Sequence, residues 1–334
     1  MKLRLLTAAF VVALFTLSIR PFAAGIEAAP DYAGVAPGPE VIIEIMPGET
    51  GSEIAQRLYE LGVVKSSLSF FRIAVTDPRS ARIAPGEHRL ETTIPARVAL
   101  EQLLDAKRIP NLIIVRDGER IAEIIESLQD FGFSKAEILA ELKRTESPAP
   151  FSGKNLEGFF YPAHYSFNRG VSVSVVIESM LERFRASTKD VEWKYGKYQP
   201  QEILTIASLV QTEGTPDVFG KVARVIYNRL EKGMPLQFDS TVHFALNRRG
   251  EIRVSINDTQ VKSPYNTFIN RGLPPGPIGS PNREAIDAAL NPAEGDWLYF
   301  VTVKPFDTRF TSSYDQFLLW KAEYKRNFKA GLFE

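Results

Sequence analysis

The sequence predicts an α+β protein with three parts: an N-terminal membrane segment, a small mixed subdomain, and a larger domain that is mainly helical with a few strands. Three observations predict it. Basic residues precede an apolar stretch at the N-terminus, strand and helix patterns alternate between 41 and 107, and helical periodicity dominates from residue 171 onward. A chain of 334 residues is long enough for more than one domain. Its composition, 44% hydrophobic and 24% charged, excludes a disordered or repetitive protein.

Charge and residue content exclude several classes of function. Lys and Arg (40) balance Asp and Glu (40), so the chain has no overall positive field for nucleic acid. The absence of cysteine excludes disulfides, thiolate nucleophiles and thiolate metal ligands. The three histidines, His88, His164 and His243, are too few for a His-ligated metal centre, and none accompanies a nucleophile elbow. We therefore expect no metal, no cofactor and no nucleic-acid partner, and turn to carboxylates for the chemistry.

The first 26 residues form a membrane anchor or a signal segment. Lys2 and Arg4 precede an apolar run at 5–19, which at 15 residues is short for a membrane span and long for the core of a signal peptide. The small residues that follow are poorly placed for cleavage, which favours an anchor with Arg20 snorkelling to the interface. On either interpretation the rest of the chain lies on the outer side of the cell membrane.

A spacer and a compact α+β unit follow. Residues 27–40 are rich in Ala, Pro and Gly, as in a stiff linker. Thr50 and Glu53 have capping-box spacing and open a helix that Gly62 closes. The other elements expected between 41 and 107 are a strand at 41–45, a helix at 68–75, a strand around 87–90 and a helix from Pro95 to about 105.

The pattern of this unit returns 70 residues later. After a second strand at 112–115, the matched positions Glu53, Ile54, Leu58 and Gly62 reappear in register as Glu123, Ile124, Leu128 and Gly132. The repetition predicts duplication of a strand-helix-helix unit. Each copy resembles the small LysM-type glycan-binding module, although no aromatic ladder marks a sugar surface. We therefore assign 41–107 to a LysM-like subdomain and 108–150 to a second half of the same kind.

The rest of the chain, within a catalytic domain at 108–334, is mainly helical. We expect an aromatic loop at 151–167, helices at 171–186, 201–213 and 221–232, a Pro/Gly loop at 272–281, a helix at 282–290, a strand at 297–303 and a last helix from about 313 to 328.

Glu213 is the sharpest catalytic candidate. At 100° per residue it lies over Ile206, Leu209 and Val210 on the apolar face of the helix, and Gly214 ends that helix directly after it. Burial and the negative end of the helix dipole both disfavour an ionised carboxylate there. Both effects raise the pKa, as a general acid near neutral pH requires.

Glu213 also lies within a series of motifs that resemble the YceG-like family of endolytic murein transglycosylases. The resemblance covers nearly the whole chain. The matching blocks are Ala207-Ser208-Leu209-Val210 with Glu213, Tyr227-Asn228-Arg229-Leu230, Gly233-Met234-Pro235-Leu236-Gln237, Asp239-x-Thr241, Ser263-Pro264-Tyr265-Asn266-Thr267, Gly272-Leu273-Pro274-Pro275-Gly276-Pro277, and upstream Glu157-Gly158-Phe159.

The resemblance implies a function and a mechanism. The substrate would be a peptidoglycan glycan strand, cut inside the strand between N-acetylmuramic acid and N-acetylglucosamine, leaving a 1,6-anhydro ring. Glu213 would act as general acid and then as general base. If Asp239 instead activated water, the enzyme would be a hydrolase. A non-catalytic scaffold that binds peptidoglycan is the third alternative, and cell-wall synthases are the expected neighbours.

The supporting residues follow from the matched blocks. We expect Asp239 in a turn before a strand, as the best alternative within the protein to stabilise the charge that develops on the sugar. Gln211 departs from the family, which has a second Glu at that position, but it lies about 160° around the helix from Glu213. The polar residues expected to orient Glu213 or bind the sugars are Gln237, Thr241, Tyr227, Asn228, Tyr265, Asn266 and Glu157.

Overall fold

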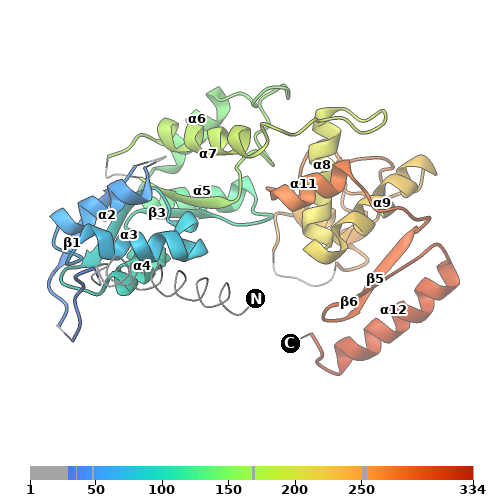
Figure 1. The fold of residues 1–334 in the computed structure, drawn as a ribbon. Coiled ribbons are helices and arrows are strands. Elements are labelled where there is room, and N and C mark those ends of the chain that lie inside the picture. The colour runs from blue at the N-terminus through green and yellow to red at the C-terminus, as the bar shows by residue number, and fades with distance from the viewer. Residues whose placement is uncertain (1–28, 35, 47–48, 168–169, 250–253, 334) are drawn as a thin grey trace, which may run out of the picture. The chain divides into compact units, whose positions relative to one another are not determined.

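The computed structural model describes residues 29–333 except 35, 47–48, 168–169 and 250–253 (Figure 1). The chain divides between Asn111 and Leu112 into two compact units. The predicted anchor at 1–26 lies outside the described residues. Within the part that is described, no helix is both long and apolar enough to cross a membrane.

The first unit has the order strand, helix, helix, strand, helix. Its elements are β1 (Glu40–Ile45), α2 (Gly51–Glu60), α3 (Ser67–Thr76), β2 (Gly86–Glu91) and α4 (Ala96–Leu104), with 3₁₀ turns at Pro78–Arg82 and Ala106–Arg108. The antiparallel register of β1 and β2 runs from Glu40 opposite Glu91 to Ile45 opposite Gly86. The predicted strands and helices of this unit are confirmed.

Local sequence signals explain these boundaries. The Thr50 side chain accepts a hydrogen bond from the Glu53 backbone, and Glu53 accepts one from the Thr50 backbone at 2.7 Å, so the predicted capping box forms. Gly62 has φ +70°, a conformation that favours glycine after a helix. Alternate strand residues such as Ile43 join Leu58 and Phe70 in a core that belongs to this unit alone.

The second unit begins with the same order of elements. They are β3 (Leu112–Val115), α5 (Ile121–Phe131), α6 (Lys135–Arg144) and β4 (Ala163–Ser166), with β3 and β4 antiparallel. The sequence interpretation of 151–167 as a loop was wrong for β4. A four-residue strand of Ala, His, Tyr and Ser has little β-propensity of its own. Pairing with β3 and burial of Tyr165 create it.

The two strand-helix-helix-strand units share hydrogen bonds at matched positions. In the second unit Glu123 accepts from the Arg120 backbone at 2.8 Å, as Glu53 accepts from Thr50 in the first. The glycine after each first helix has a positive φ, +70° and +123°. A Glu and a Gly therefore occupy matched positions in both strand-helix-helix-strand segments, and the second segment ends at Ser166. Duplication of the unit stays a prediction.

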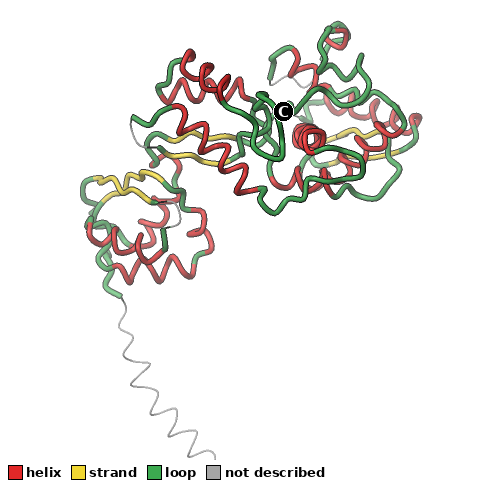
Figure 2. Tube along the Cα trace, turned by 90° about the horizontal axis from the view of Figure 1, so that it is seen from above, coloured by secondary structure: helices red, strands yellow, loops and turns green. Residues whose placement is uncertain are grey.

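Helices dominate the remainder of the second unit, with short paired strands (Figure 2). They are α7 (Val173–Ser187), α8 (Pro200–Glu213), α9 (Phe219–Glu231), α10 (Asp239–Ala245), α11 (Arg283–Leu290), the antiparallel pair β5 (Tyr299–Lys304) and β6 (Asp307–Thr311), and α12 (Tyr314–Lys329), with 3₁₀ turns at Pro216–Val218 and Asp258–Gln260. The predicted helices and strand are confirmed. The hairpin partner β6 was not predicted, and α12 lies along this hairpin (Figure 1).

Helix α8 is the centre of the second unit. Every residue from Ile203 to Val210 is buried, against α9 and α11 on one side and against the core of α7 through Leu204. Only the first and last turns reach the surface. Glu213, the last residue, is therefore presented at the end of a rigid, fully packed helix.

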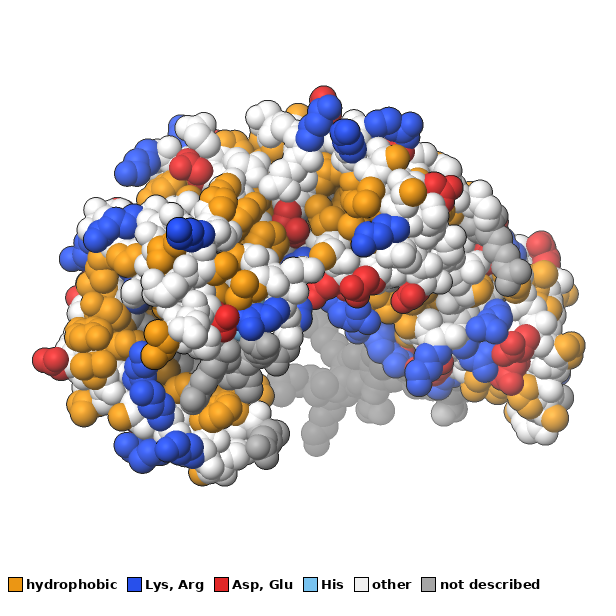
Figure 3. Space-filling view, turned by 180° about the vertical axis from the view of Figure 1, so that it is seen from behind, with side chains coloured by type: hydrophobic (Ala, Val, Ile, Leu, Met, Phe, Trp, Pro, Cys, Tyr) orange, Lys and Arg blue, Asp and Glu red, His pale blue; other side chains and the backbone are white. Residues whose placement is uncertain are grey.

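Charged side chains are mixed on the surface. On the face seen in Figure 3, Lys and Arg lie among Asp and Glu rather than in a field of one sign. This agrees with the equal totals of acidic and basic residues.

Candidate active site

Glu213 meets the first turn of α10. The Ser240 hydroxyl donates a hydrogen bond to Oε1 of Glu213. Burial raises the pKa of Glu213 to about 7, against the opposing effect of the Ser240 hydrogen bond. The negative charge of Asp239 acts on this pKa in the same direction as burial. The carboxyl group can therefore carry a proton near neutral pH.

Asp239 is the first residue of α10, so its expected place in a turn before a strand was wrong. Leu236 and Phe238 are buried on either side of the exposed Gln237, and this alternation imitates the approach to a strand. Burial raises the pKa of Asp239, while the backbone of Val254 lowers it. Asp239 thus lies beside the candidate acid and acts on it through charge.

Arg229 is the positively charged side chain that acts on Glu213. Only 8% of it is exposed, and its Nε donates to the Leu298 carbonyl at 2.6 Å. Another guanidinium N–H donates to the Leu236 carbonyl. Its charge slightly lowers the pKa of Glu213. Arg229 is therefore a structural cation that also moderates the acid.

A pair of threonine hydroxyls holds the loop that leads into α10. Thr241 and Thr267 lie 2.9 Å apart at their hydroxyls, and both are buried. The Thr267 hydroxyl accepts from the Phe238 backbone at 3.0 Å, and its carbonyl accepts from the Gln237 backbone at 3.1 Å. Gln237 has φ +53° and an exposed side chain. Thr241 therefore positions the loop, while the side chain of Gln237 stays exposed.

Comparison with known proteins shows the family of this chain. The YceG-like family matches residues 43–323. The chain belongs to the YceG-like family. It is 31% identical over 306 residues to the endolytic murein transglycosylase of Bacillus subtilis strain 168, with 85% of this chain and 84% of that protein covered.

Two further relatives support the family. The endolytic murein transglycosylase of Streptococcus pneumoniae R6 is 30% identical over 301 residues, which cover 78% of this chain and 54% of that protein. The chain thus spans about half the length of the streptococcal relative. A crystal structure of a YceG-like protein from Listeria monocytogenes matches with a TM-score of 0.57 and 26% identity, over 83% of this chain and 97% of that one.

In this YceG-like chain, Tyr227 and Asn228 bond to the backbone. Tyr227 is fully buried, and its hydroxyl donates to the Ala289 carbonyl at 2.7 Å. The Asn228 amide donates to the carbonyls of Gly295 and Trp297 at 3.1 and 2.9 Å. The Tyr227 hydroxyl therefore ties α9 to α11, and the Asn228 amide secures the segment between α11 and β5.

In the loop motif at Tyr265 and Asn266, one side chain is buried and the other is partly exposed. Asn266 is fully buried and donates to the carbonyls of Thr259 and Val261. Tyr265 is only half-buried, and its ring packs on Phe244 with centroids 4.7 Å apart. Asn266 shapes the loop, and Tyr265 keeps part of its surface for other contacts.

Glu157 caps a helix in the second strand-helix-helix-strand unit. Its carboxylate accepts from the backbone of Ile121, the first residue of α5, at 3.2 Å. Burial raises its pKa to about 7, while that hydrogen bond and the charge of Arg120 lower it. The YceG-like motif at Glu157 therefore provides a second buried carboxyl, distinct in its partners from Glu213.

Gln211, which replaces the family's second Glu, has a structural partner. Its Oε1 accepts from the backbone of Asn282, the cap of α11, at 2.9 Å. One turn earlier, the Ser208 hydroxyl accepts from the backbone of Ile278 at 3.1 Å. Position 211 thus fastens the loop that follows the prolines to α8. The side chain of Gln211 thus bonds to the backbone of Asn282 and not to Glu213.

Sequence reasoning missed Ser240. It occupies the unassigned position in Asp239-x-Thr241, whose two flanking residues were both chosen. A helix beginning at Asp239 was the missing signal, because it places position 240 in the same first turn as Asp239.

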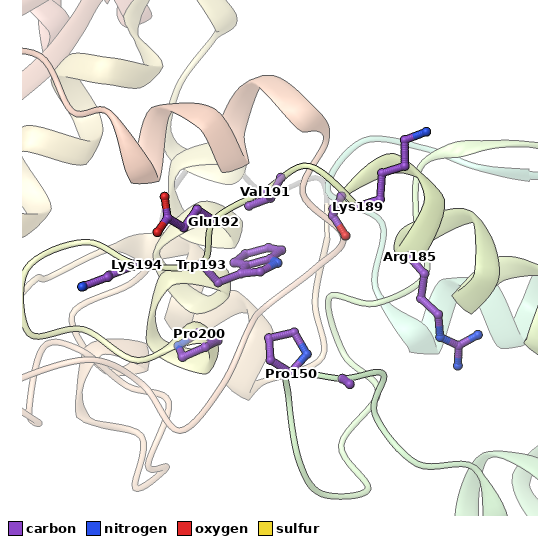
Figure 4. Close-up of a pocket in the computed structure, with 10 residues that line it drawn as sticks. Pro150, Arg185, Lys189, Val191, Glu192, Trp193, Lys194 and Pro200 are labelled. Atoms are coloured by element: carbon purple, nitrogen blue, oxygen red, sulfur yellow. The ribbon is translucent and has the colours of Figure 1, made fainter.

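A cavity of about 640 Å³ lies elsewhere in this unit, at the opposite end of α8 from Glu213. In Figure 4 the ring of Trp193 lies next to Pro150, while the guanidinium of Arg185 extends away from both. None of the predicted site residues lines it. Among the described residues, no three His, Asp or Glu side chains are grouped to hold a metal ion.

Proposed function

We propose that this protein cuts peptidoglycan glycan strands internally, as an endolytic murein transglycosylase, with Glu213 as its catalytic acid and base. The geometry of Glu213 carries the proposal. It combines a half-buried carboxyl, a pKa of about 7 and a serine partner at the end of a packed helix. The names of the relatives from B. subtilis and S. pneumoniae supply the substrate class.

The chemistry needs one proton carrier. Protonated Glu213 gives its proton to the glycosidic oxygen as the bond between that oxygen and C1 of N-acetylmuramic acid breaks. The N-acetyl oxygen of the same sugar stabilises the positive charge that develops at C1. Ionised Glu213 then takes the proton of the C6 hydroxyl, whose oxygen bonds to C1. The products are a 1,6-anhydro end, a free GlcNAc hydroxyl and a reprotonated Glu213, so protons balance without water.

Residues 1–26 and the two strand-helix-helix-strand units would attach the enzyme to the membrane and to its substrate. We place the protein in the cell membrane through residues 1–26, with both compact units on the outer side. The first strand-helix-helix-strand unit, and its repeat, would hold glycan as LysM-like modules. Cell-wall synthases are the expected partners, because new strands are the substrate of an internal cut.

The test is mass spectrometry of fragments that the full-length protein, in detergent, releases from purified sacculi. Glu213→Gln removes the acid, and Glu157→Gln is its matched control, since it neutralises a second carboxyl whose pKa is also about 7. We expect anhydro-muramic ends from the wild type and the control, and none from Glu213→Gln.

The other outcomes each point elsewhere. Reducing ends would make the enzyme a hydrolase and turn attention to Asp239. If the protein binds glycan strands but releases neither product, the remaining function is that of a non-catalytic scaffold that binds peptidoglycan. If Glu213→Gln and Glu157→Gln lose the release of anhydro-muramic ends equally, Glu213 is not the specific catalytic acid.

A further inference from the structure

One side chain holds the carboxyl of Glu213. The Ser240 hydroxyl donates to Oε1, and no other side chain among the described residues donates to this carboxyl group. Ser240 is only 9% exposed, so bulk water competes weakly for its hydroxyl. The two carboxyl oxygens of Glu213 are therefore unequal.

We infer that Ser240 is a positioning residue for Glu213: by donating to Oε1 it leaves Oε2 as the oxygen that carries the transferable proton. The inference deepens the proposed function and rests on it. A protonated carboxyl carries its hydrogen on one oxygen, and the oxygen that already accepts a hydrogen bond is the natural acceptor. Ser240 thereby selects which face of the carboxyl gives the proton.

The same bond serves the second half of the reaction. A hydroxyl donor binds a carboxylate more strongly than a neutral carboxylic acid. The Ser240 bond therefore strengthens as Glu213 loses its proton, and it steadies the anion that must next take a proton from the C6 hydroxyl. Ser240 also lowers the pKa of Glu213 from the value that burial alone would give. The two effects act in the same direction.

The neighbouring charges act on the same group from two helices. Asp239, next to Ser240 in α10, raises the pKa of Glu213, and Arg229 of α9 lowers it. No side chain of α8 itself enters this balance. Among these side chains only Ser240 bonds to an oxygen of Glu213, and the Ser240 backbone N–H also lowers the pKa of this carboxyl group.

The fold holds Ser240 firmly enough for this role. The next residue, Thr241, donates from its hydroxyl to the Phe238 carbonyl at 2.7 Å and pairs with the Thr267 hydroxyl at 2.9 Å. Thr267 in turn accepts from the Phe238 backbone. The segment on both sides of Ser240 is thus fixed by buried bonds, so the hydroxyl is aimed before substrate arrives.

The experiment compares Ser240→Ala, which removes the hydroxyl, with Ser240→Thr, which keeps one. The readout is kcat/KM against pH on sacculi, whose alkaline limb reports the pKa of the acid in the free enzyme. Loss of a bond that favours the carboxylate raises this pKa. We expect the limb of Ser240→Ala to move up by about one pH unit and its rate at the optimum to fall ~10-fold, with Ser240→Thr restoring both.

Ser208→Ala is the matched control for loss of a buried serine hydroxyl. Ser208 bonds to the Thr205 carbonyl and the Ile278 backbone, not to Glu213. It should lower thermal stability without moving the limb. If Ser240→Ala is slower but its alkaline limb stays at the wild-type pH, the substitution has damaged structure only, and the inference is overturned. An enzyme with wild-type rate and wild-type limb overturns it as well.

An infrared titration keeps the inference separate from the proposed function. The carboxyl band of Glu213, identified by its loss in Glu213→Gln, is followed with pH in the full-length protein. We expect its midpoint to rise in Ser240→Ala and to return in Ser240→Thr. A wild type that makes no anhydro ends would defeat the proposed function, while this titration would still decide whether Ser240 holds Glu213.

Discussion

Gly279 approaches the carbonyl oxygen of Gly118 so closely that a Cβ at Gly279 would stand 2.4 Å from it. The contact joins the loop after the prolines to the turn before α5. Two backbone bonds flank it, from Gly118 to the Ser280 carbonyl at 2.7 Å and from Ser280 to the Glu119 carbonyl at 2.9 Å. No side chain, however small, fits between them.

Gly279→Ala should therefore separate loop and turn. Since the obstacle is backbone and not the tip of a flexible side chain, we expect a loss of ~2–3 kcal/mol in the free energy of unfolding. Gly220→Ala in α9 is the control, because a Cβ there meets its nearest neighbour at an ordinary 3.5 Å and a helix favours Ala. Urea denaturation of both variants checks this. Equal stability of the two would contradict the contact.

The raised pKa of Glu213 predicts a pH-dependent stability. Its pKa is about 7 in the folded protein and near 4.5 when exposed, so between these values the folded state binds the extra proton. The stability that this group contributes is present at low pH and is lost as pH rises through 7. Glu213→Gln cannot ionise, so we expect its Tm advantage over wild type to grow from pH 5 to pH 8.

Glu157→Gln should show the same trend, because Glu157 is also buried with a pKa of about 7. Thermal scans at several pH values measure both variants. A Tm difference that stays constant with pH would show that the carboxyl titrates alike in the folded and unfolded chain.

Replacing Arg229 by Lys should destabilise the protein more than the same replacement at an exposed arginine. Its guanidinium reaches the carbonyls of Leu298 and Leu236 together, which a single ammonium group cannot do. Arg229→Lys leaves a buried carbonyl without its partner and should cost ~2 kcal/mol in unfolding free energy. Arg185→Lys, which alters an exposed ion pair with Glu178, should change stability by less than ~1 kcal/mol. Denaturant midpoints compare them.

Tyr227 and Tyr198, whose rings pack together, differ in whether the hydroxyl has a hydrogen-bond partner. The Tyr227 hydroxyl donates to the Ala289 carbonyl, whereas that of Tyr198 is buried with no hydrogen-bond partner among the described residues. Tyr227→Phe should cost ~1 kcal/mol, and Tyr198→Phe should be neutral or slightly stabilising. Neither should alter the fragments released from sacculi. A changed product pattern in Tyr227→Phe would place that hydroxyl in contact with the glycan.

Glu213 was chosen from the sequence mainly because it lies within the motifs that resemble the YceG-like family, and its position in the helix agrees with that choice. Helical periodicity places it on an apolar face, and Gly214 ends the helix after it. The cause of its raised pKa was predicted only in part. Burial is the largest cause, but Asp239 and Ser240 act from a helix that the sequence did not show.

The supporting residues were harder to assign, because a polar side chain within a motif can serve the backbone as well as a ligand. Tyr227 and Asn228 bond to backbone carbonyls far away in sequence, at Ala289 and at Gly295 and Trp297, while Asn266 bonds to backbone carbonyls of its own loop region. Nothing local distinguishes such a partner from a sugar. The strands β4 and β6 were missed for a similar reason, since each depends on a partner strand and not on its own residues.

The side-chain ties along α8 have a consequence for local unfolding. Ser208 and Gln211 bind the backbone N–H groups of Ile278 and Asn282, so these two amides are protected by the helix and not by any helix or strand of their own. They can exchange with deuterium only when the loop detaches from α8. The amides of Ile278 and Asn282 should therefore exchange at similar rates, and Ser208→Ala should speed the exchange of both. Their exchange rates report whether the loop stays attached to the end of α8 that carries Glu213.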